Sequence, residues 1–231
     1  AMASHPESPS GGDGVRSQEP TAAGAPPAVE INYFAEQEQA LQKKFRALRD
    51  HWLGPLVRGC LRAGVTADVI SGLAVLSLLP FGLSLFDLAG SWSPQVAVLS
   101  LALHVLLDGL DGPVARGAGT DGPAGAFTDM CLDHIGFLTV TVLITAAGVV
   151  AGTAACAYVA TYTLAVVMVV VLNLLGRPFR YVVRTKYIFY LLIGLQQLAG
   201  LNLLSEAATV FSLVHALFAA TGFVRVRNAL R

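Results

Sequence analysis

Apolar residues along this chain fall into a series of long runs separated by short polar stretches. Six such runs cover roughly residues 66–86, 95–115, 125–150, 153–175, 187–204 and 206–224. Most of them reach the ~20 residues that an α-helix needs to cross ~30 Å of hydrocarbon. A helix satisfies its own backbone polar groups, as a bilayer requires. The pattern therefore predicts an all-α integral membrane protein, with a bundle of six transmembrane helices over residues 54–231.

The part of the chain before these runs has a different pattern. Over residues 30–53 the large apolar side chains are three, four or seven positions apart, with charged residues between them. This spacing places them on one face of a helix. They are Ile31, Phe34, Leu41, Phe45, Leu48 and Trp52.

This amphipathic helix is too polar to span a membrane. It suits either a helix lying in the membrane interface or a soluble coiled-coil segment, and we favour the interface because an apolar run follows closely. Residues 1–29 are rich in Pro, Gly, Ser and Ala and nearly free of large apolar side chains. Such a segment cannot bury enough surface to offset its ordering entropy, so a disordered tail is predicted.

Composition and charge placement support the membrane interpretation. Only 13% of the 231 residues are charged and 55% are hydrophobic, whereas soluble domains carry about 25% charged residues. Lysine and arginine occur before residue 63, at Arg116, between Arg177 and Lys186, and after residue 224. With six crossings, all of them fall on one side, which the positive-inside rule makes cytoplasmic together with both termini. We expect a multi-pass protein of a bacterial cytoplasmic membrane, without a nucleic-acid partner.

Four aspartates lie at the ends of the second and third apolar runs. Asp108 and Asp111 are three residues apart, and Asp129 and Asp133 are four apart, so each pair shares one helical face. The short loop between the runs makes the two helices antiparallel neighbours, which predicts one shared site near the cytoplasmic end. A carboxylate at membrane depth costs roughly 2.5–3.5 kcal/mol. Because clustered carboxylates repel one another unless cations neutralise them, we expect Mg²⁺ or Mn²⁺ there.

Small residues and one arginine accompany these carboxylates. Gly112, Ala115 and Gly125 fall on the same faces as the aspartates. They permit either close approach of a planar base or pyrophosphate, or tight packing between helices, and both roles remain open. Arg116 is placed to meet a phosphate or to pair with an aspartate.

The string formed by these residues resembles the signature of a known family. It reads D-x-x-D-G-x-x-A-R, then eight residues, then G-x-x-x-D-x-x-x-D, over residues 108–133. This is similar to the signature of the CDP-alcohol phosphotransferases at every fixed position. The resemblance implies transfer of a phosphatidyl-type group from a CDP-lipid such as CDP-diacylglycerol to a small alcohol, with release of CMP. It also implies two bound Mg²⁺ or Mn²⁺ ions and a homodimer.

The resemblance assigns roles to matching positions. Asp108, Asp111 and Asp129 would be metal ligands, and Asp133 would be both the general base and a further ligand. The residues lining the cytidine nucleotide pocket, with Asp111 close by, would be Gly112, Ala115, Arg116 and Gly125.

The acceptor alcohol is less well specified by the sequence. Arg177, Arg180 and Arg184 lie between the fourth and fifth apolar runs. They suit the phosphate of an acceptor such as inositol phosphate or glycerol phosphate, or else anionic lipid headgroups. Glycerol-phosphate enzymes of the family commonly continue as D-P-x-A-D-K, whereas this chain continues with His134 after Asp133. Unphosphorylated acceptors such as serine, choline or inositol remain alternatives.

Membrane proteins of two other classes also carry carboxylates within the bilayer. Carboxylates inside membranes also mark the ion pathways of transporters, and intramembrane prenyltransferases bind pyrophosphate through metal-bound aspartates. A transporter leaves the Gly-x-x-Ala-Arg segment unexplained, and a prenyltransferase calls for two separated aspartate motifs. His104 lies one helical turn before Asp108 and could reach the site, and His134 follows Asp133. For both, we favour a packed or hydrogen-bonded histidine over a member of the site. Asp68 stands where relatives often carry asparagine, and its role is left open.

Overall fold

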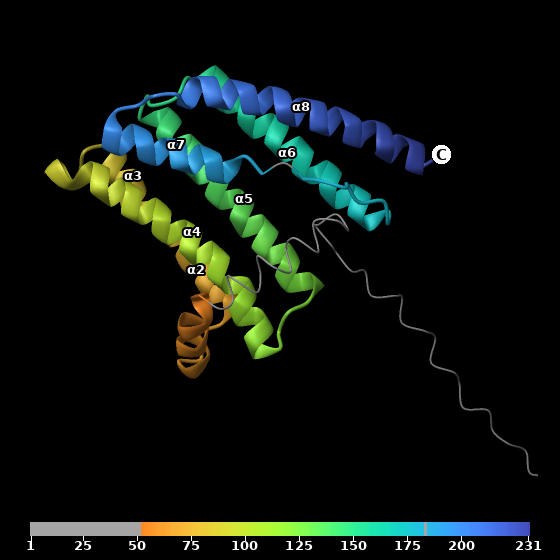
Figure 1. Ribbon diagram of the computed structural model, residues 1–231, viewed down its shortest axis with the longest axis horizontal. Helices are drawn as coiled ribbons and strands as arrows, with labels where there is room; N and C mark the ends of the chain where they lie inside the picture. Colours follow the sequence, from red (N-terminus) through yellow and green to blue (C-terminus); the bar gives the residue numbers. More distant parts are fainter. Residues whose placement is uncertain (1–51, 183) are drawn as a thin grey trace, which may run out of the picture.

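The structure, a computed structural model, describes residues 52–182 and 184–231. The predicted tail over residues 1–29 and nearly all of the predicted amphipathic helix over 30–53 lie outside these residues. Within the described part the secondary structure is entirely helical, so the all-α prediction is confirmed there. A helical segment over 52–62 comes first, ahead of the elements labelled in Figure 1.

The remaining helices follow in the order of the apolar runs. They are α2 (Ala67–Leu76), α3 (Leu78–Leu85), the short 3₁₀-helix η1 (Gly90–Trp92), α4 (Ser93–Ala118), α5 (Pro123–Ala146), α6 (Gly152–Leu174), α7 (Lys186–Ala199) and α8 (Leu204–Ala229).

Local sequence explains several helix boundaries. Thr66 caps α2, because its hydroxyl accepts a hydrogen bond from the backbone N–H of Val69. The first apolar run breaks at Ser77, between α2 and α3, and α2 ends at Leu76, four residues before Pro80. Proline has no N–H for the carbonyl of Leu76, and its ring crowds that carbonyl. Helix α4 ends at Gly119, which has a φ of 67°, and α5 begins at Pro123.

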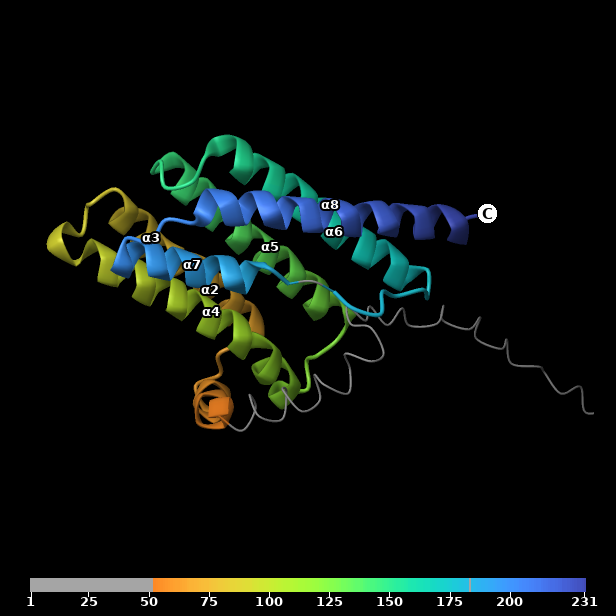
Figure 2. The same ribbon diagram turned by 45° about the horizontal axis from the view of Figure 1, so that its top comes forward.

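The described residues contain five helical stretches long and apolar enough to cross a membrane. These are Ala67–Leu85, Gly90–Ala118, Pro123–Ala146, Gly152–Leu174 and Leu204–Ala229. The predicted span over 187–204 corresponds to α7, which has 14 residues and a length of about 21 Å. Helix α7 alone is therefore too short to span, and the count of six transmembrane helices is not confirmed. Figures 1 and 2 show the non-helical chain after α6 running back along the bundle to the start of α7.

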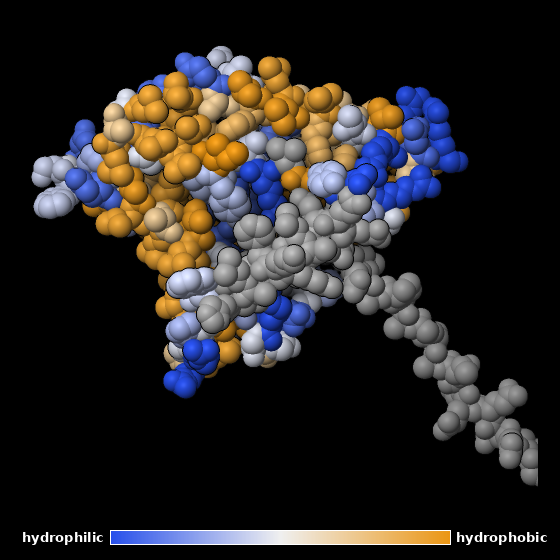
Figure 3. All heavy atoms as spheres, viewed as in Figure 1, coloured by the Kyte–Doolittle hydropathy of each residue, from blue (hydrophilic) through white to orange (hydrophobic). Residues whose placement is uncertain are grey.

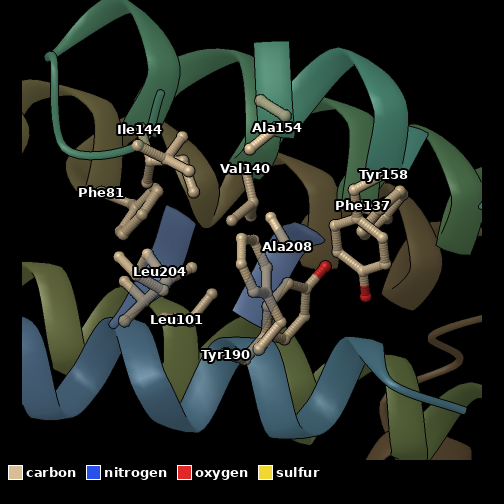
Figure 4. Packing of buried hydrophobic residues seen from close by; sticks show 14 of the residues in the cluster. Phe81, Leu101, Phe137, Val140, Ile144, Ala154, Tyr158, Tyr190, Leu204 and Ala208 are labelled. Carbon is tan, nitrogen blue, oxygen red and sulfur yellow. The ribbon is translucent and has the colours of Figure 1, made fainter. Parts of the chain in front are cut away.

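The core lies where α3, α4, α5, α6, α7 and α8 meet. Phe81, Phe137, Tyr158 and Phe189 are fully buried there, and Figure 4 shows several of these side chains facing one another. The ring of Phe137 packs edge-on against Tyr158, with their centroids 5.1 Å apart. This packing fixes α5 against α6, so it also sets the position of the polar half of α5.

A second, smaller cluster ties the start of the described chain to the bundle. Val57 and Leu61, from the helical segment over 52–62, pack against the buried side chains of Ile70, Leu110 and Val114. This cluster holds α2 beside the second half of α4.

The outer surface is apolar over much of the helix flanks. Leu99, Leu213 and Leu217 are each more than two-thirds exposed, as expected for side chains that face lipid. Figure 3 shows apolar surface over much of the upper and left part of the visible face, and hydrophilic residues gathered near the end of α8. The fold is therefore that of a multi-pass membrane protein.

Candidate active site

The four aspartates line one cleft between α4 and α5. Asp108 and Asp111 come from the second half of α4, and Asp129 and Asp133 come from the first half of α5. The loop of residues 119–122 turns the chain between the two helices, so the two polar halves lie side by side (Figure 1). Helix α2 closes the cleft through Ser71, Ala74 and Val75.

Asp111 is the most firmly held of the four carboxylates. It is 5% exposed, and its Oδ2 accepts a hydrogen bond of 2.6 Å from the Ser71 hydroxyl. Its Oδ1 accepts another, also of 2.6 Å, from the backbone N–H of Gly112. Hydrogen bonds to both oxygens stabilise a buried carboxylate in its charged form. The sequence analysis did not identify Ser71 as a site residue, since it lies within the first apolar run, outside the signature.

Asp108 and Asp133 share a cation that sequence reasoning did not place at the site. Lys186, the first residue of α7, donates hydrogen bonds from its ammonium group to Asp108, at 3.4 Å, and to Asp133. The hydroxyl of Tyr187 also donates to Asp108 Oδ2, at 3.3 Å. The sequence showed Lys186 only as one of several basic residues between the fourth and fifth apolar runs.

His104 forms the inner boundary of the cleft, one helical turn before Asp108. The ring is 1% exposed, and its Nδ1 lies 2.8 Å from the carbonyl oxygen of Ala74, so Nδ1 carries the proton and donates it. Its Nε2 has no hydrogen-bond partner. A Cβ at Gly136 would lie 2.6 Å from the His104 ring, so only glycine lets α5 approach α4 this closely. His104 is packed and hydrogen-bonded as predicted, but it also lines the cleft, so its side chain does reach the site.

His134 points away from this cleft into the bundle. Its Nε2 lies 3.0 Å from the Thr163 hydroxyl, and its ring stacks on Tyr162 at a centroid distance of 5.8 Å. Asp68 is exposed in the first turn of α2, where an acidic side chain suits the positive end of the helix dipole.

The other signature residues neighbour the aspartates along α4 and α5 but, within the described chain, are not among the residues that line the cleft. Gly112 and Ala115 are half-buried on α4, while Arg116 and Gly125 are exposed. A Cβ at Gly112 would come no closer than 3.4 Å to the flexible end of Arg116, and one at Gly125 would come no closer than 4.0 Å. The described chain therefore does not require glycine at these two positions for packing between helices.

The three arginines between α6 and α7 are exposed. They do not belong to the described residues that line the cleft. Arg177, Arg180 and Arg184 belong to a segment that Phe179 anchors, with its ring stacked on Phe218 at 4.1 Å. Arg225 of α8 donates to the carbonyl of Pro178 at 3.0 Å. Arg184 ends this segment two residues before Lys186.

The chemistry of this cleft suits hard divalent cations. Its donors are carboxylate oxygens, which Mg²⁺ and Mn²⁺ prefer. Among residues 52–182 and 184–231, however, no three acidic, histidine or cysteine side chains are arranged as a ready ligand set. Lys186 lies between two of the carboxylates instead, so the donor set fits a divalent ion once these side chains turn toward it.

Comparison with known families agrees with this geometry. The model of the family described as CDP-alcohol phosphatidyltransferase matches residues 64–224, which is well over half of the chain. The chain belongs to the CDP-alcohol phosphatidyltransferase family. The matched range includes α2 and all four aspartates, so the resemblance seen in the signature is confirmed. The curated proteins compared with the chain give no match.

Membership of the CDP-alcohol phosphatidyltransferase family sets the reaction class. These enzymes are transferases that move a phosphatidyl group from a CDP-alcohol donor to an alcohol acceptor, and they generally use divalent metal ions. Together with the apolar helices, this makes the chain a multi-pass membrane transferase of a phospholipid-synthesis family.

Proposed function

We propose that this protein transfers the phosphatidyl group of CDP-diacylglycerol to a small alcohol and releases CMP, in a divalent-metal-dependent reaction. The observation that carries the proposal is the convergence of Asp108, Asp111, Asp129 and Asp133 on one cleft. Four carboxylates from two adjoining membrane helices are costly to keep unless they hold cations. A transporter or a prenyltransferase would not need the rest of the family signature that surrounds them.

The four aspartates are the proposed ligands of two Mg²⁺ or Mn²⁺ ions. When bound, these ions would neutralise charge on the pyrophosphate and on the departing CMP. Asp111 is already fixed by Ser71 and by the N–H of Gly112, so it offers a preset position to a ligand. Asp129 is exposed at the mouth of the cleft, where it can turn toward a ligand.

The nucleotide is proposed to lie against Gly112, Ala115, Arg116 and Gly125, beside Asp111. A Cβ at Gly112 would meet only the flexible end of Arg116, and one at Gly125 would come no closer than 4.0 Å to Thr120. Packing between helices therefore gives no reason for glycine at these positions, which supports contact with a ligand. Of the two roles left open by the sequence, close approach by a ligand is therefore favoured. The exposed guanidinium of Arg116 is suited to bind a phosphate oxygen.

Asp133 is the proposed general base. It accepts the proton of the acceptor hydroxyl, and the acceptor oxygen then forms a bond to the phosphorus that carries the lipid. The bond between that phosphorus and the CMP oxygen breaks, and CMP leaves with the electron pair. Asp133 is partly exposed in the cleft, with a side chain 28% accessible, so an acceptor can reach it.

The acceptor is proposed to enter along the arginine segment. Arg177, Arg180 and Arg184 would bind the phosphate of an acceptor such as inositol phosphate. Of the three, Arg184 is nearest along the chain to Lys186, which contacts two aspartates of the cleft. We propose that both termini and this entrance face the cytoplasm of a bacterial inner membrane, since the basic residues then lie on one side. A homodimer is proposed from the family resemblance alone.

A panel of acceptors tests the proposed function. The purified protein in lipid bilayers receives CDP-diacylglycerol and Mg²⁺ with inositol phosphate, glycerol phosphate, inositol, serine or choline in turn. Release of CMP together with a lipid of the mass of the phosphatidyl conjugate is expected for one acceptor, with inositol phosphate favoured. CMP release with none of them, or a product lacking the phosphatidyl group, would contradict the proposal.

A further inference from the structure

Lys186 occupies an unusual place for a cation. It is the first residue of α7, where the positive end of the helix dipole disfavours positive charge. It is also only 4% exposed, and an ammonium group is costly to bury without partners. Its position therefore needs a compensating interaction from outside its own helix.

The carboxylates of the cleft supply that interaction. The ammonium group contacts Asp108 of α4 and Asp133 of α5. Asp129 and Asp111 are close enough to attract it electrostatically as well. One cation from α7 thus lies among all four of the proposed metal ligands and joins the two helices that carry them.

Neighbouring contacts hold Lys186 in this position. The hydroxyl of Thr185, the preceding residue, lies 2.6 Å from the buried hydroxyl of Tyr158 on α6. The ammonium group lies 4.6 Å from the centre of the Tyr187 ring, close enough for a cation–π interaction. The start of α7 is therefore attached to α6, and the ammonium group can move only by rotation about the bonds of the flexible four-carbon lysine stem.

We propose that Lys186 is a tethered counter-ion that competes with divalent metal for the aspartates. Without metal, its ammonium group neutralises Asp108 and Asp133 and holds α4 and α5 together. Binding of a divalent ion displaces the ammonium group from these two carboxylates. Lys186 thereby lowers the affinity of the site for metal and preserves the fold when metal is absent. This inference rests on the proposed metal site.

Metal binding measured directly tests this role. Free Mn²⁺ is followed by electron paramagnetic resonance during titration of the wild type, Lys186→Met and Lys186→Arg. Removing one positive charge from the carboxylate cluster should tighten Mn²⁺ binding by at least about tenfold. Lys186→Arg keeps the charge and should bind Mn²⁺ like the wild type. Arg227→Met, which removes an exposed cation in the last turn of α8, is the matched control and should leave Mn²⁺ affinity unchanged.

Thermal unfolding gives a second measurement. In the presence of a chelator, Lys186→Met should unfold at a lower temperature than the wild type, and saturating Mn²⁺ should abolish that difference. Lys186→Gln, prepared with Mn²⁺ throughout, serves if the methionine variant does not fold without metal. Failure of both variants to fold even with Mn²⁺ would overturn the proposal.

The outcomes separate this inference from the proposed function. Wild-type protein that binds Mn²⁺ while Lys186→Met binds it no more tightly would overturn the counter-ion role alone. Equal tightening by Lys186→Arg would also overturn it, because charge would then not be the cause. Wild-type protein that binds no Mn²⁺ at all would contradict the metal site of the proposed function itself.

Discussion

Gly109 and Gly112 both lie on α4, but only Gly112 is proposed to contact the nucleotide. Gly112 belongs to the family signature and follows Asp111, whereas Gly109 lies outside the signature positions. A Cβ at Gly109 would meet no atom within 4 Å, and one at Gly112 would approach only the end of Arg116. The protein alone thus tolerates alanine at both positions, and a bound nucleotide would distinguish them.

Substituting these glycines separates ligand contact from helix packing. Gly112→Ala should raise the KM for CDP-diacylglycerol by about tenfold or more, because a methyl group would intrude where the nucleotide approaches, at a cost of about 1–3 kcal/mol. Gly109→Ala is the matched control and should leave this KM unchanged. Both variants should melt no lower than the wild type, since alanine favours a helix over glycine. Equal KM values for the two variants would remove Gly112 from the nucleotide pocket.

The sequence made the aspartates predictable but not the lysine among them. Spacings of three and four residues put each carboxylate pair on one helical face, and the short loop required neighbouring helices. Lys186 lies 53 residues from Asp133 along the chain. Its position at the site depends on the course of the non-helical chain between α6 and α7. Hydrophobic periodicity predicts helices and cannot predict that course.

The start of α7 is the element on which the position of that lysine depends. Tyr158 of α6 and Thr185 share a buried hydrogen bond of 2.6 Å, and Thr185 also accepts the backbone N–H of Phe189 through its carbonyl. The first turn of α7 is thus attached to α6 by one side-chain pair.

A double-mutant cycle measures the strength of this attachment. Tyr158→Phe and Thr185→Val should each destabilise the protein, because each removes one hydroxyl and leaves the other buried without its hydrogen-bond partner. Their coupling energy should be about 1 kcal/mol, so that the double variant loses less than the sum of the two. Unfolding by denaturant in detergent micelles provides the four free energies of unfolding, for the wild type, the two single variants and the double variant. Additive losses would show that the two hydroxyls do not interact.

At the scale of elements, apolar periodicity predicted most helices and missed two interruptions. The break between α2 and α3 follows from Pro80, a signal that the apolar run conceals because proline is flanked by leucine and phenylalanine. Helix α7 is shorter than its apolar run because Gly200 adopts a φ of 68° and ends it. Residues 201–203 continue the run without helical structure.

The proposed orientation of the whole molecule in the membrane is inferred from the placement of its charges. Asp121 lies in the loop after α4, at the proposed cytoplasmic end, and Ser91 lies in η1 at the other end of this helix. Both residues are exposed. The 26 residues of α4 cover about 39 Å, which is enough to place these two positions on opposite faces of a bilayer.

Thiol labelling in intact bacterial cells tests this orientation. Single cysteines are introduced as Ser91→Cys or Asp121→Cys after Cys60, Cys131 and Cys156 are replaced by alanine. A membrane-impermeant maleimide should label Ser91→Cys from outside, and should label Asp121→Cys only after the membrane is opened. The reverse pattern would place the aspartate cleft on the outer face and contradict the proposed entry of the acceptor from the cytoplasm.

The release of CMP shows directly whether the four aspartates between α4 and α5 split a CDP-lipid. Rates are measured with CDP-diacylglycerol and the best acceptor for Asp108→Asn, Asp111→Asn, Asp129→Asn and Asp133→Asn, each shown to remain folded. Each should lose at least about a hundredfold in rate, since each removes a charge that acts on the reacting groups. Asp121→Asn, an exposed neighbour outside the signature, should match the wild type. Wild-type rates in any of the four site variants would contradict the account.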